Sequence, residues 1–357
     1  MANPTSSPDV KIKLGSLEVD DSDFQSYTVE RDMMQADMAQ IVVSNQGAKY
    51  SKVKISDPVE IKIGDQQKLV YQGEIVGLEP TYKGGEKTRL VVRAMNKMHR
   101  LMRNVKSVTF MDKTDQQILN ETVSDCGLTL DFKHETSINY KHVYRHSQSA
   151  LEFLRTRAAR IGCYVWCVDT TVHVKQPELT AAPIADLKLN ESSTDGTLRS
   201  FTPRISHNQH FSKVTLKGWN PETKELITGE ATAQNSPLGG SNFASAASGF
   251  GDQELFIADL PVHSAEEAKV IAKAKLQDAA LQFITGEAEI TGDPDMDLGK
   301  VIKITPNSDP NASPDEDPFN GKYFIVGLTH RHTQSKSKDG GFTTILRLAR
   351  DATKSGG

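Results

Sequence analysis

The order of hydrophobic and polar residues divides the chain into two strand-like regions with a different segment between them. Residues 10–105 contain short stretches in which apolar and polar positions alternate, separated by Gly, Asp, Asn and Pro. The segment DPVEIKIGDQQKLVYQGEIVGLEP shows this most clearly, with Val59, Ile61 and Ile63 on one face and GDQQ as a turn. A period of two is typical of strands with one buried face, so this region predicts a small β-barrel or sandwich.

The segment that follows has a helical period. In DKTDQQILNETVSDCGL, Asp112 or Thr114 is placed to begin a helix and Gly127 to end it. SQSALEFLRTRAARIG predicts a second helix, with Ser147 or Ser149 as its N-cap.

Two short strands are expected after these helices, in CYVWCVDTTVHVKQ, with their turn at Asp169 and Thr170. Residues 107–177 are therefore predicted to form a small α+β unit. Residues 178–197 are polar and are expected to be a linker.

Strand-like alternation returns near residue 197 and continues to the last strand, GFTTILRLARD. Two stretches rich in small or acidic residues, 232–253 and 306–321, interrupt it and predict surface loops. The domain boundaries expected from these changes of pattern are 1–106, 107–190 and 191–357. The predicted fold is mainly β with an α+β insertion.

One helix is predicted within the second strand-like region, over residues 264–283. Ser264 and Glu267 have capping-box spacing. Five apolar residues share one helical face, and Lys269, Lys273 and Asp278 are expected to point outward. The helix is therefore predicted to lie against the outside of the second β-domain. The apolar face consists of Ala268, Ala272, Leu276, Ala279 and Phe283.

Composition narrows the classes of partner. The 357 residues have 25% charged and 37% hydrophobic residues and a formal net charge of −4, with both signs interspersed. A balanced charge does not favour nucleic acid or an anionic membrane as partner. The first residues, MANPTSSPDVKIKL, lack a basic start followed by an apolar run, which favours folding in a cytoplasm.

Candidate chemistry is sparse. The sequence contains no G-x-x-x-x-G-K-[ST], G-x-G-x-x-G, G-x-S-x-G or H-E-x-x-H motif, so no catalytic, cofactor-binding or metal-binding residue is predicted. Cys126, Cys163 and Cys167 are too few for a disulfide framework and are expected to be reduced thiols, mostly buried.

Histidines and aspartates leave alternatives open. His330 and His332 share a strand face, and His207 and His210 lie near the start of another strand. Either pair could hold a metal, but no acidic or Cys partner stands at a recognisable spacing, so a solvated or interface face is the preferred interpretation. In GDPDMDLG the alternating aspartates begin like a calcium loop, but Leu298 and Ile304 break the pattern, so an acidic hairpin turn is predicted. The aspartates are Asp293, Asp295 and Asp297.

Four stretches in succession resemble the phage late-control protein D and VgrG family, which forms the central baseplate hub of contractile tails and injection systems. They are residues 147–174, 198–231, 261–304 and 319–351. No single motif is decisive, because the resemblance comes from their order.

The resemblance implies a homotrimer in which each chain supplies two barrels like the tail-tube subunit, giving a pseudo-sixfold ring. That ring would adapt the sixfold tube above to a threefold spike protein below, with other baseplate proteins around it. It also implies assembly in the bacterial cytoplasm, and then a place in a phage tail or injection particle. Since the sequence ends at ARDATKSGG without a β-helical spike, it resembles the late-control branch, in which the spike is a separate protein.

Two other functions remain as hypotheses. The β-rich pattern with scattered acidic residues also fits a carbohydrate-binding or carbohydrate-acting protein. Such a site needs exposed aromatic residues, and Trp166 and Trp219, both in strand or hairpin context, are the only tryptophans. The remaining hypothesis is a truncated VgrG-like spike carrier.

Overall fold

The computed structural model describes residues 8–82, 88–135, 137–189, 198–206, 211–241, 243–244, 253–306, 317–334 and 341–353. Within these ranges no helix is long and apolar enough to cross a membrane. His207 and His210 lie outside the described residues, as do parts of both predicted loops.

The first strand-like region forms a curled antiparallel sheet in the spatial order β3-β4-β7-β6-β5-β1-β2. Its alternating apolar residues point to one side and form a core, as the sequence predicts for residues such as Val59, Ile61 and Ile63. A short 3-10 helix, η1, spans Gln46–Ala48. The strands are β1 Val10–Leu14, β2 Leu17–Glu18, β3 Phe24–Asp32, β4 Met38–Ser44, β5 Pro58–Ile63, β6 Lys68–Thr81 and β7 Arg89–Met95.

The second strand-like region contains a sheet in the order β14-β18-β21-β20-β19-β13. A bridge between Leu189 and Leu198 brings β13 beside β14, so this sheet curls back on itself. Its strands are β13 Asp186–Lys188, β14 Leu198–Ile205, β18 Ile284–Thr291, β19 Val301–Thr305, β20 Gly321–Thr333 and β21 Gly341–Arg350.

The expected linker at 178–197 is wrong for its central part. Residues 186–188 form β13, which pairs in parallel with β19, and Leu187 is buried in the core of the second region. The segment is polar in composition, but one apolar residue and three backbone pairings suffice to place it in the sheet.

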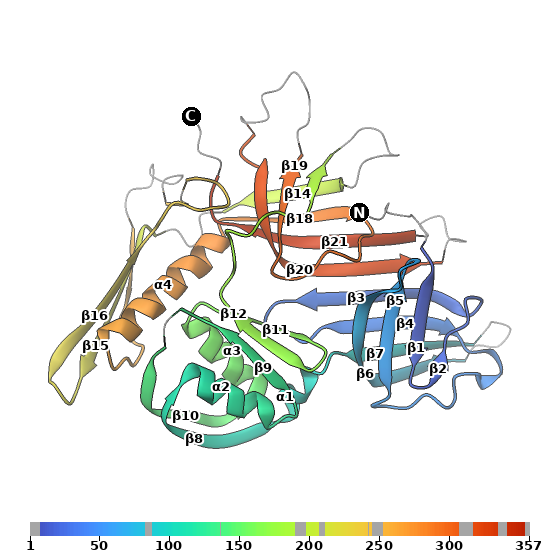
Figure 1. Ribbon diagram of the computed structural model, residues 1–357, viewed down its shortest axis with the longest axis horizontal. Helices are drawn as coiled ribbons and strands as arrows, with labels where there is room; N and C mark the ends of the chain where they lie inside the picture. Colours follow the sequence, from blue (N-terminus) through green and yellow to red (C-terminus); the bar gives the residue numbers. More distant parts are fainter. Residues whose placement is uncertain are drawn as a thin grey trace.

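The two regions share one continuous sheet. The C-terminal part of β20 pairs with β3, although these strands lie near opposite ends of the sequence. Figure 1 shows β18, β21, β20, β3 and β4 stacked as neighbours through the centre of the molecule.

The two helices and the short strand pair predicted between the two regions are present. Thr114 caps the first long helix in a capping box with Gln117, and Ser149 caps the second. Gly127 adopts a positive φ of 70° just beyond the first of these helices, where glycine is favoured. The pattern analysis did not identify α1 or the long strands β8 and β10. The elements are α1 His99–Arg103, β8 Val105–Thr114, α2 Asp115–Ser124, β9 Thr129–Lys133, β10 Asn139–Ser149, α3 Ala150–Arg160, β11 Tyr164–Val168 and β12 Thr171–Lys175.

Helix α4, Ala265–Leu281, has the predicted cap and the predicted buried face, but its position differs from the expectation. It lies between a separate three-stranded sheet and the α+β unit rather than only outside a β-domain (Figure 1). One face contacts Gly229, where an added Cβ would lie 2.2 Å from the Ala268 carbonyl carbon. The separate sheet comprises β15 Lys213–Asn220, β16 Glu225–Thr232 and β17 Glu254–Ile257.

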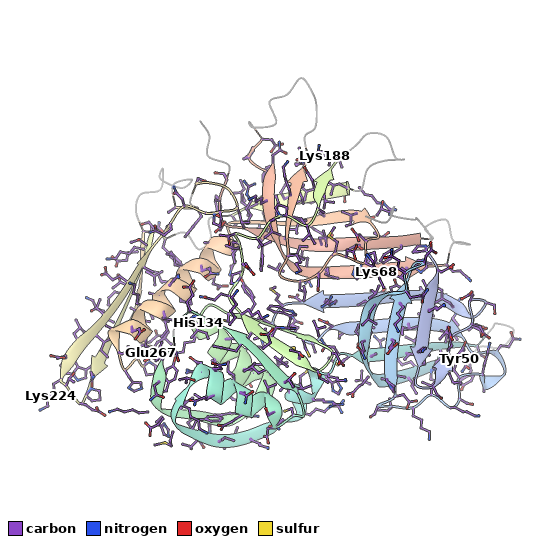
Figure 2. All side chains as sticks on the ribbon, in the orientation of Figure 1. Tyr50, Lys68, His134, Lys188, Lys224 and Glu267 are labelled. Carbon is purple, nitrogen blue, oxygen red and sulfur yellow. The ribbon has the colours of Figure 1, made fainter. Side chains whose placement is uncertain are left out.

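The other side of α4 contacts α3. The buried carboxylate of Glu267 accepts a hydrogen bond from Arg160 at 2.7 Å and one from the backbone N–H of His263 at 2.8 Å. Figure 2 places Glu267 beside the α+β unit and Lys224 at the outer tip of the β15–β16 hairpin. Glu267 is buried although it is charged, so the pattern of apolar residues alone did not reveal this second buried side of the helix.

The two strand regions are internal repeats of one structure. Their spatial orders correspond strand by strand, as β1-β5-β6-β7-β4-β3 and β13-β19-β20-β21-β18-β14. The one difference in direction is that β1 is antiparallel to β5 whereas β13 is parallel to β19.

Irregularities in the sheets also repeat. Strands β6 and β20 each carry a register shift within the same four residues, IVGL, at 75–78 and 325–328. Strands β3 and β14 each carry a shift after their first residue, at Phe24/Ser26 and Leu198/Ser200. Bulges are specific local features of a sheet, so their coincidence identifies which residues of the two regions are equivalent.

Candidate functional site

The pairing of β20 with β3 forms the joint between the two repeats. Seven residue pairs link β20 to β3, from Gly327 opposite Asp32 to Thr333 opposite Ser26. Arg347 on β21 lies opposite Gly327, and its guanidinium reaches across this glycine to the Asp32 carboxylate at 2.8 Å. A Cβ on Gly327 would lie 2.5 Å from Nε of Arg347, so the glycine leaves the space that the ion pair occupies.

The sheet around this joint has one buried face and one mainly polar face. Residues directly opposite each other on paired strands share a face, so the register assigns every position from β6 to β14. Acidic and basic residues are interspersed on the polar face. They include Glu30, Asp32, Glu74, Glu79, Glu287, Glu289, Arg89, Arg93, Arg204, Arg331 and Arg347.

His330 and His332 do share a strand face, as predicted, but the face is the buried one. Burial lowers the pKa of His330 to about 3 and the pKa of His332 to about 4. His330 forms a hydrogen bond with Thr344 Oγ1 at 2.9 Å. The preferred interpretation of a solvated or interface face is therefore wrong, because Arg331 between them takes the exposed side of the strand.

Around His332 the joint is aromatic. Its ring centroid lies 5.5 Å from that of Phe24, 5.7 Å from that of Tyr27 and 6.2 Å from that of Phe342. Neither ring nitrogen has a hydrogen-bond partner, and the Tyr27 hydroxyl is likewise buried without one. In the part of the chain that the structure describes, no group of three His, Cys, Asp or Glu side chains is arranged to hold a metal ion.

The predicted acidic turn at 293–297 is a connection between β18 and β19 rather than a hairpin, because these two strands do not pair with each other. Its aspartates reach back to the first repeat. Asp297 binds Arg31 at 2.7 Å, and Asp295 pairs with Lys68. The turn therefore adds ionic contacts beside the β3–β20 joint.

Arg31 also binds the buried carboxylate of Asp37 at 3.0 Å. Burial raises the pKa of Asp37 to about 6, although the positive charge of Arg31 opposes this rise. Arg31 thus connects the acidic turn to the residue that precedes β4, whose backbone oxygen accepts a hydrogen bond from the backbone N–H of Asn96 at 3.0 Å.

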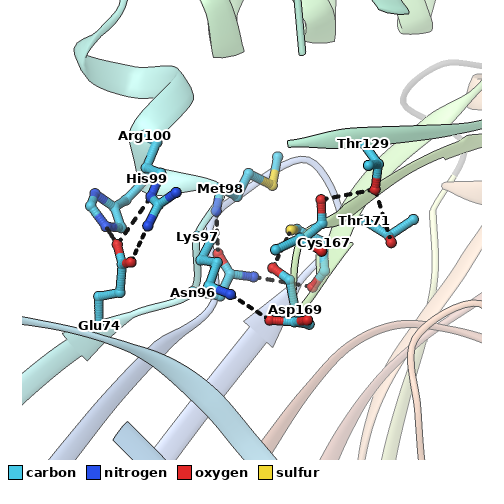
Figure 3. A network of polar contacts seen from close by, with 11 residues as sticks. Glu74, Asn96, Lys97, Met98, His99, Arg100, Thr129, Cys167, Asp169 and Thr171 are labelled. Carbon is cyan, nitrogen blue, oxygen red and sulfur yellow. Dashed lines mark hydrogen bonds and ion pairs between the residues drawn. The ribbon is translucent and has the colours of Figure 1, made fainter. Parts of the chain in front are cut away.

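A second polar network connects the first repeat to the α+β unit (Figure 3). Glu74 on β6 binds His99 at 2.9 Å and also pairs with Arg100. Lys97 binds Asp169 at 2.6 Å, and the side-chain amide of Asn96 donates to the backbone oxygen of Cys167 at 3.2 Å. These contacts hold the α+β unit in a defined orientation against the sheet.

The cysteines and tryptophans do not form a chemical site. Cys163 and Cys167 are buried, as predicted, and burial raises the pKa of each thiol to about 12, whereas Cys126 is partly exposed. Trp166 stacks on His173 at 5.1 Å. Trp219 is exposed on the outer face of β15.

Trp219 lies opposite Leu226, and Phe256 lies opposite Thr215 on the same outer face of the separate sheet. All three apolar side chains are more than half exposed. Pattern reasoning missed this face because each of the three residues occurs in a different strand.

In the described part of the chain, two strand edges of the continuous sheet have no neighbour along part of their length. Among these residues, β6 pairs from Gly77 to Thr81 with β7 alone, and β14 pairs with β18 alone apart from the single bridge at Leu198. Both edges are largely exposed to solvent. An unpaired edge is a template for pairing with another chain, so these two are the candidate assembly edges.

Comparison with solved structures supports the same architecture over the whole chain. A tail protein from Neisseria meningitidis MC58 matches with a TM-score of 0.71 and 14% identity, covering 97% of each chain. The 43 kDa tail protein of prophage MuSo2 from Shewanella oneidensis matches with a TM-score of 0.70 and 15% identity, covering 98% of this chain and 100% of that one. An Escherichia coli component of the type VI secretion system matches with a TM-score of 0.62 and 11% identity, covering 95% and 76%.

At these identities the likeness concerns the fold. A search of curated proteins finds no match to the sequence. A family model described as the Alg8 N-terminal domain matches residues 6–334, which is nearly the entire chain. The chain therefore belongs to the Alg8 N-terminal domain family.

Proposed function

We propose that this protein is a structural subunit of a contractile tail or injection-system baseplate, and that it forms the central hub. The main support is the pair of unlike free edges on a sheet built from two like repeats. Such a subunit can pair head to tail, because one edge belongs to the first repeat and the other to the second. The whole-length likeness to phage tail proteins and to a type VI secretion component supports the same role.

The mechanism of such a hub is geometric rather than catalytic. Three chains contribute six similar repeats, which matches a sixfold tail tube. The α+β unit and the arm of α4 with β15, β16 and β17 occur once per chain. Three chains would therefore present threefold features to a spike, while the repeats present pseudo-sixfold features to the tube.

Neighbouring proteins follow from this role. We propose a tail-tube protein above the ring, a spike protein below it and other baseplate proteins around it. The protein would fold in the bacterial cytoplasm and then reside in the tail or injection particle. The mainly polar sheet face would suit a ring lumen, because its interspersed acidic and basic residues offer no patch of one sign to retain a passing nucleic acid or protein.

Native mass measured by light scattering during size-exclusion chromatography, followed by averaged electron images of the same peak, tests this proposal. A three-chain ring with an open centre is the expected result. A protein that stays monomeric even with its tube and spike partners would contradict the hub role and leave only the fold.

A further inference from the structure

The pairing of β20 with β3 inside the chain is a template for a contact between chains. Strand β6 is the equivalent of β20 in the first repeat, and β14 is the equivalent of β3 in the second. Within the chain, β20 and β3 meet, whereas the corresponding parts of β6 and β14 have no partner on that edge among the described residues. Each chain thus carries one half of the same joint at each end of its sheet.

We infer that β6 of one copy pairs antiparallel with β14 of the next copy, in the register that β20 and β3 adopt within the chain. This inference rests on the proposed assembly role and specifies its interface. The matching bulges define the register, since IVGL at 75–78 and at 325–328 carries the same register shift, and β14 carries the same shift as β3. The resulting pairs are Gly77–Ser206, Leu78–Ile205, Glu79–Arg204, Pro80–Pro203, Thr81–Thr202 and Tyr82–Phe201.

The transferred register brings together side chains of matching character. On the core side, Leu78 meets Ile205 and Tyr82 meets Phe201, in place of the His332–Tyr27 contact within the chain. Tyr82 is 75% exposed and Ile205 36% exposed, so both gain burial from the contact. An apolar residue on one edge therefore faces an apolar residue on the other wherever the buried face continues.

On the polar side, the register places Glu79 opposite Arg204. In the single chain Glu79 pairs with Arg93 of β7 at 2.5 Å, and both side chains are about half exposed. A second arginine opposite Glu79 would flank its carboxylate with two positive charges. Opposite charges on directly paired strand positions favour one register over its neighbours.

The prolines fit the same register. Pro80 and Pro203 each lie in a strand with one neighbour, so their missing N–H faces the free edge. The register pairs them with each other, so neither leaves the other strand's N–H donor unsatisfied. Prolines on these edges also hinder pairing in other registers, which would bring a backbone donor against a residue that has no N–H to exchange.

The contact is heterologous, because it joins two different edges. Repeated, it generates either a closed ring or an open filament, and closure after three copies gives the six repeats proposed above. Because the nitrogens of the paired prolines face the interface, these prolines occupy a position where two residues would normally exchange backbone hydrogen bonds. The neighbouring pairs, Glu79–Arg204 and Thr81–Thr202, are therefore of the alternating type without mutual backbone hydrogen bonds, in which the Cα atoms lie closest together.

Disulfide cross-linking tests the register directly. In a full-length chain carrying Cys126→Ser, we expect Glu79→Cys together with Arg204→Cys to form disulfide-linked oligomers on mild oxidation, because Cα atoms of such a pair lie about 4.5 Å apart. Each single variant should give no ladder. The matched control combines Glu79→Cys with Ser200→Cys, which lies on the same exposed face of β14 but four residues out of register.

Every outcome bears on the inference. A covalent three-chain ring supports both the register and the hub, and covalent filaments support the register but contradict the hub. A three-chain ring that does not cross-link, or that cross-links as readily through Ser200→Cys, overturns the register and leaves the hub standing. A monomer that never cross-links, at any concentration up to its solubility limit, contradicts both.

Charge reversal provides a second readout that does not depend on thiols. Glu79→Arg or Arg204→Glu alone should weaken association about tenfold or more, because like charges then face each other. Both changes together should restore most of the affinity. Because both side chains are exposed in the single chain, the melting temperature of each variant monomer should remain near that of the parent. If the double variant fails to recover, the two residues do not face each other.

Discussion

The guanidinium of Arg347 lies 2.8 Å from the carboxylate of Asp32, on the far side of Gly327. This ion pair crosses the line where the second repeat meets the first. Its equivalent in the first repeat is Arg93, which lies opposite Gly77 but turns instead toward Glu79 on the same edge. At the internal joint the arginine of this Gly–Arg arrangement therefore pairs across the joint, whereas at the free edge the equivalent arginine pairs within its own repeat.

Replacing Asp32 by Asn should lower the unfolding free energy by less than about 1 kcal/mol, because partly exposed ion pairs contribute little. Burial raises the pKa of Asp32 even though Arg347 opposes this, which also argues against a large stabilisation. Urea denaturation at neutral pH measures the difference. A loss above about 2 kcal/mol would mean that the pair, rather than the apolar face, holds the joint.

Gly229→Ala should destabilise the protein by about 1–3 kcal/mol, the usual effect of overpacking a tight contact. The added Cβ would lie 2.2 Å from the backbone of Ala268, which cannot rotate away as a side chain could. Gly77→Ala is the matched control, because its nearest neighbour, the Arg93 Cβ, lies 3.5 Å away. Equal melting temperatures for the two variants would contradict the close packing of α4 on β16.

His332→Phe should increase stability, and more at pH 5 than at pH 8. The unfolded chain protonates this imidazole below about pH 6.5, whereas burial lowers its pKa in the folded protein to about 4. Unfolding therefore takes up a proton between these values, and the stability of the parent protein falls as pH decreases through that window. Phenylalanine does not titrate and leaves no unpartnered nitrogen among Phe24, Tyr27 and Phe342.

Denaturant titrations of parent and variant at several pH values measure this effect. If the profile of His332→Phe matched that of the parent, another group would be responsible for the acid sensitivity.

Asp115→Ala should cost about 3–5 kcal/mol, because it leaves a buried arginine without its counter-charge. Arg157 donates to Asp115 Oδ1 through Nε at 2.8 Å and Nη2 at 2.6 Å, and the Tyr140 hydroxyl donates to Oδ2 at 2.8 Å. In contrast, Glu222→Ala removes an ion pair with Lys141 in which both side chains are about 70% exposed, and should cost under about 1 kcal/mol.

Chemical denaturation of both variants, monitored by circular dichroism, measures these differences. The Asp115→Ala variant should lose structure first in the α+β unit, since Asp115, Tyr140 and Arg157 all belong to it. Comparable small losses for both variants would show that the buried pair adds nothing beyond a surface pair.

Local features of the structure could be predicted from the sequence because they depend on neighbours within a few residues. Thr114, Ser149 and Ser264 cap their helices by bonding backbone donors three residues ahead. The strand turn at Asp169 and Thr170 also forms as expected. Alternation likewise determined that His330 and His332 share a face.

Which face that is depended on distant partners. His332 is buried because Phe24, Tyr27 and Phe342 cover it, and two of these residues lie about three hundred positions away in the sequence. The pattern at 293–297 predicts a hairpin for the same reason, because the contacts of its aspartates with Arg31 and Lys68 join residues that are equally distant in the sequence. The duplicated IVGL at 75–78 and 325–328 was visible in the sequence and would have signalled the repeat, but its importance rests on the bulges that it forms.

The sequence by itself determined most strands outside the α+β unit, the capped helices and the order of the three segments, since side-chain periodicity and capping act over a few residues. Only the tertiary structure decided that β20 pairs with β3, that α4 is buried on two sides and that the edges of β6 and β14 remain open. The reason is physical: every strand offers the same backbone donors and acceptors on both edges, so its partner depends on which other edges the whole fold brings within reach.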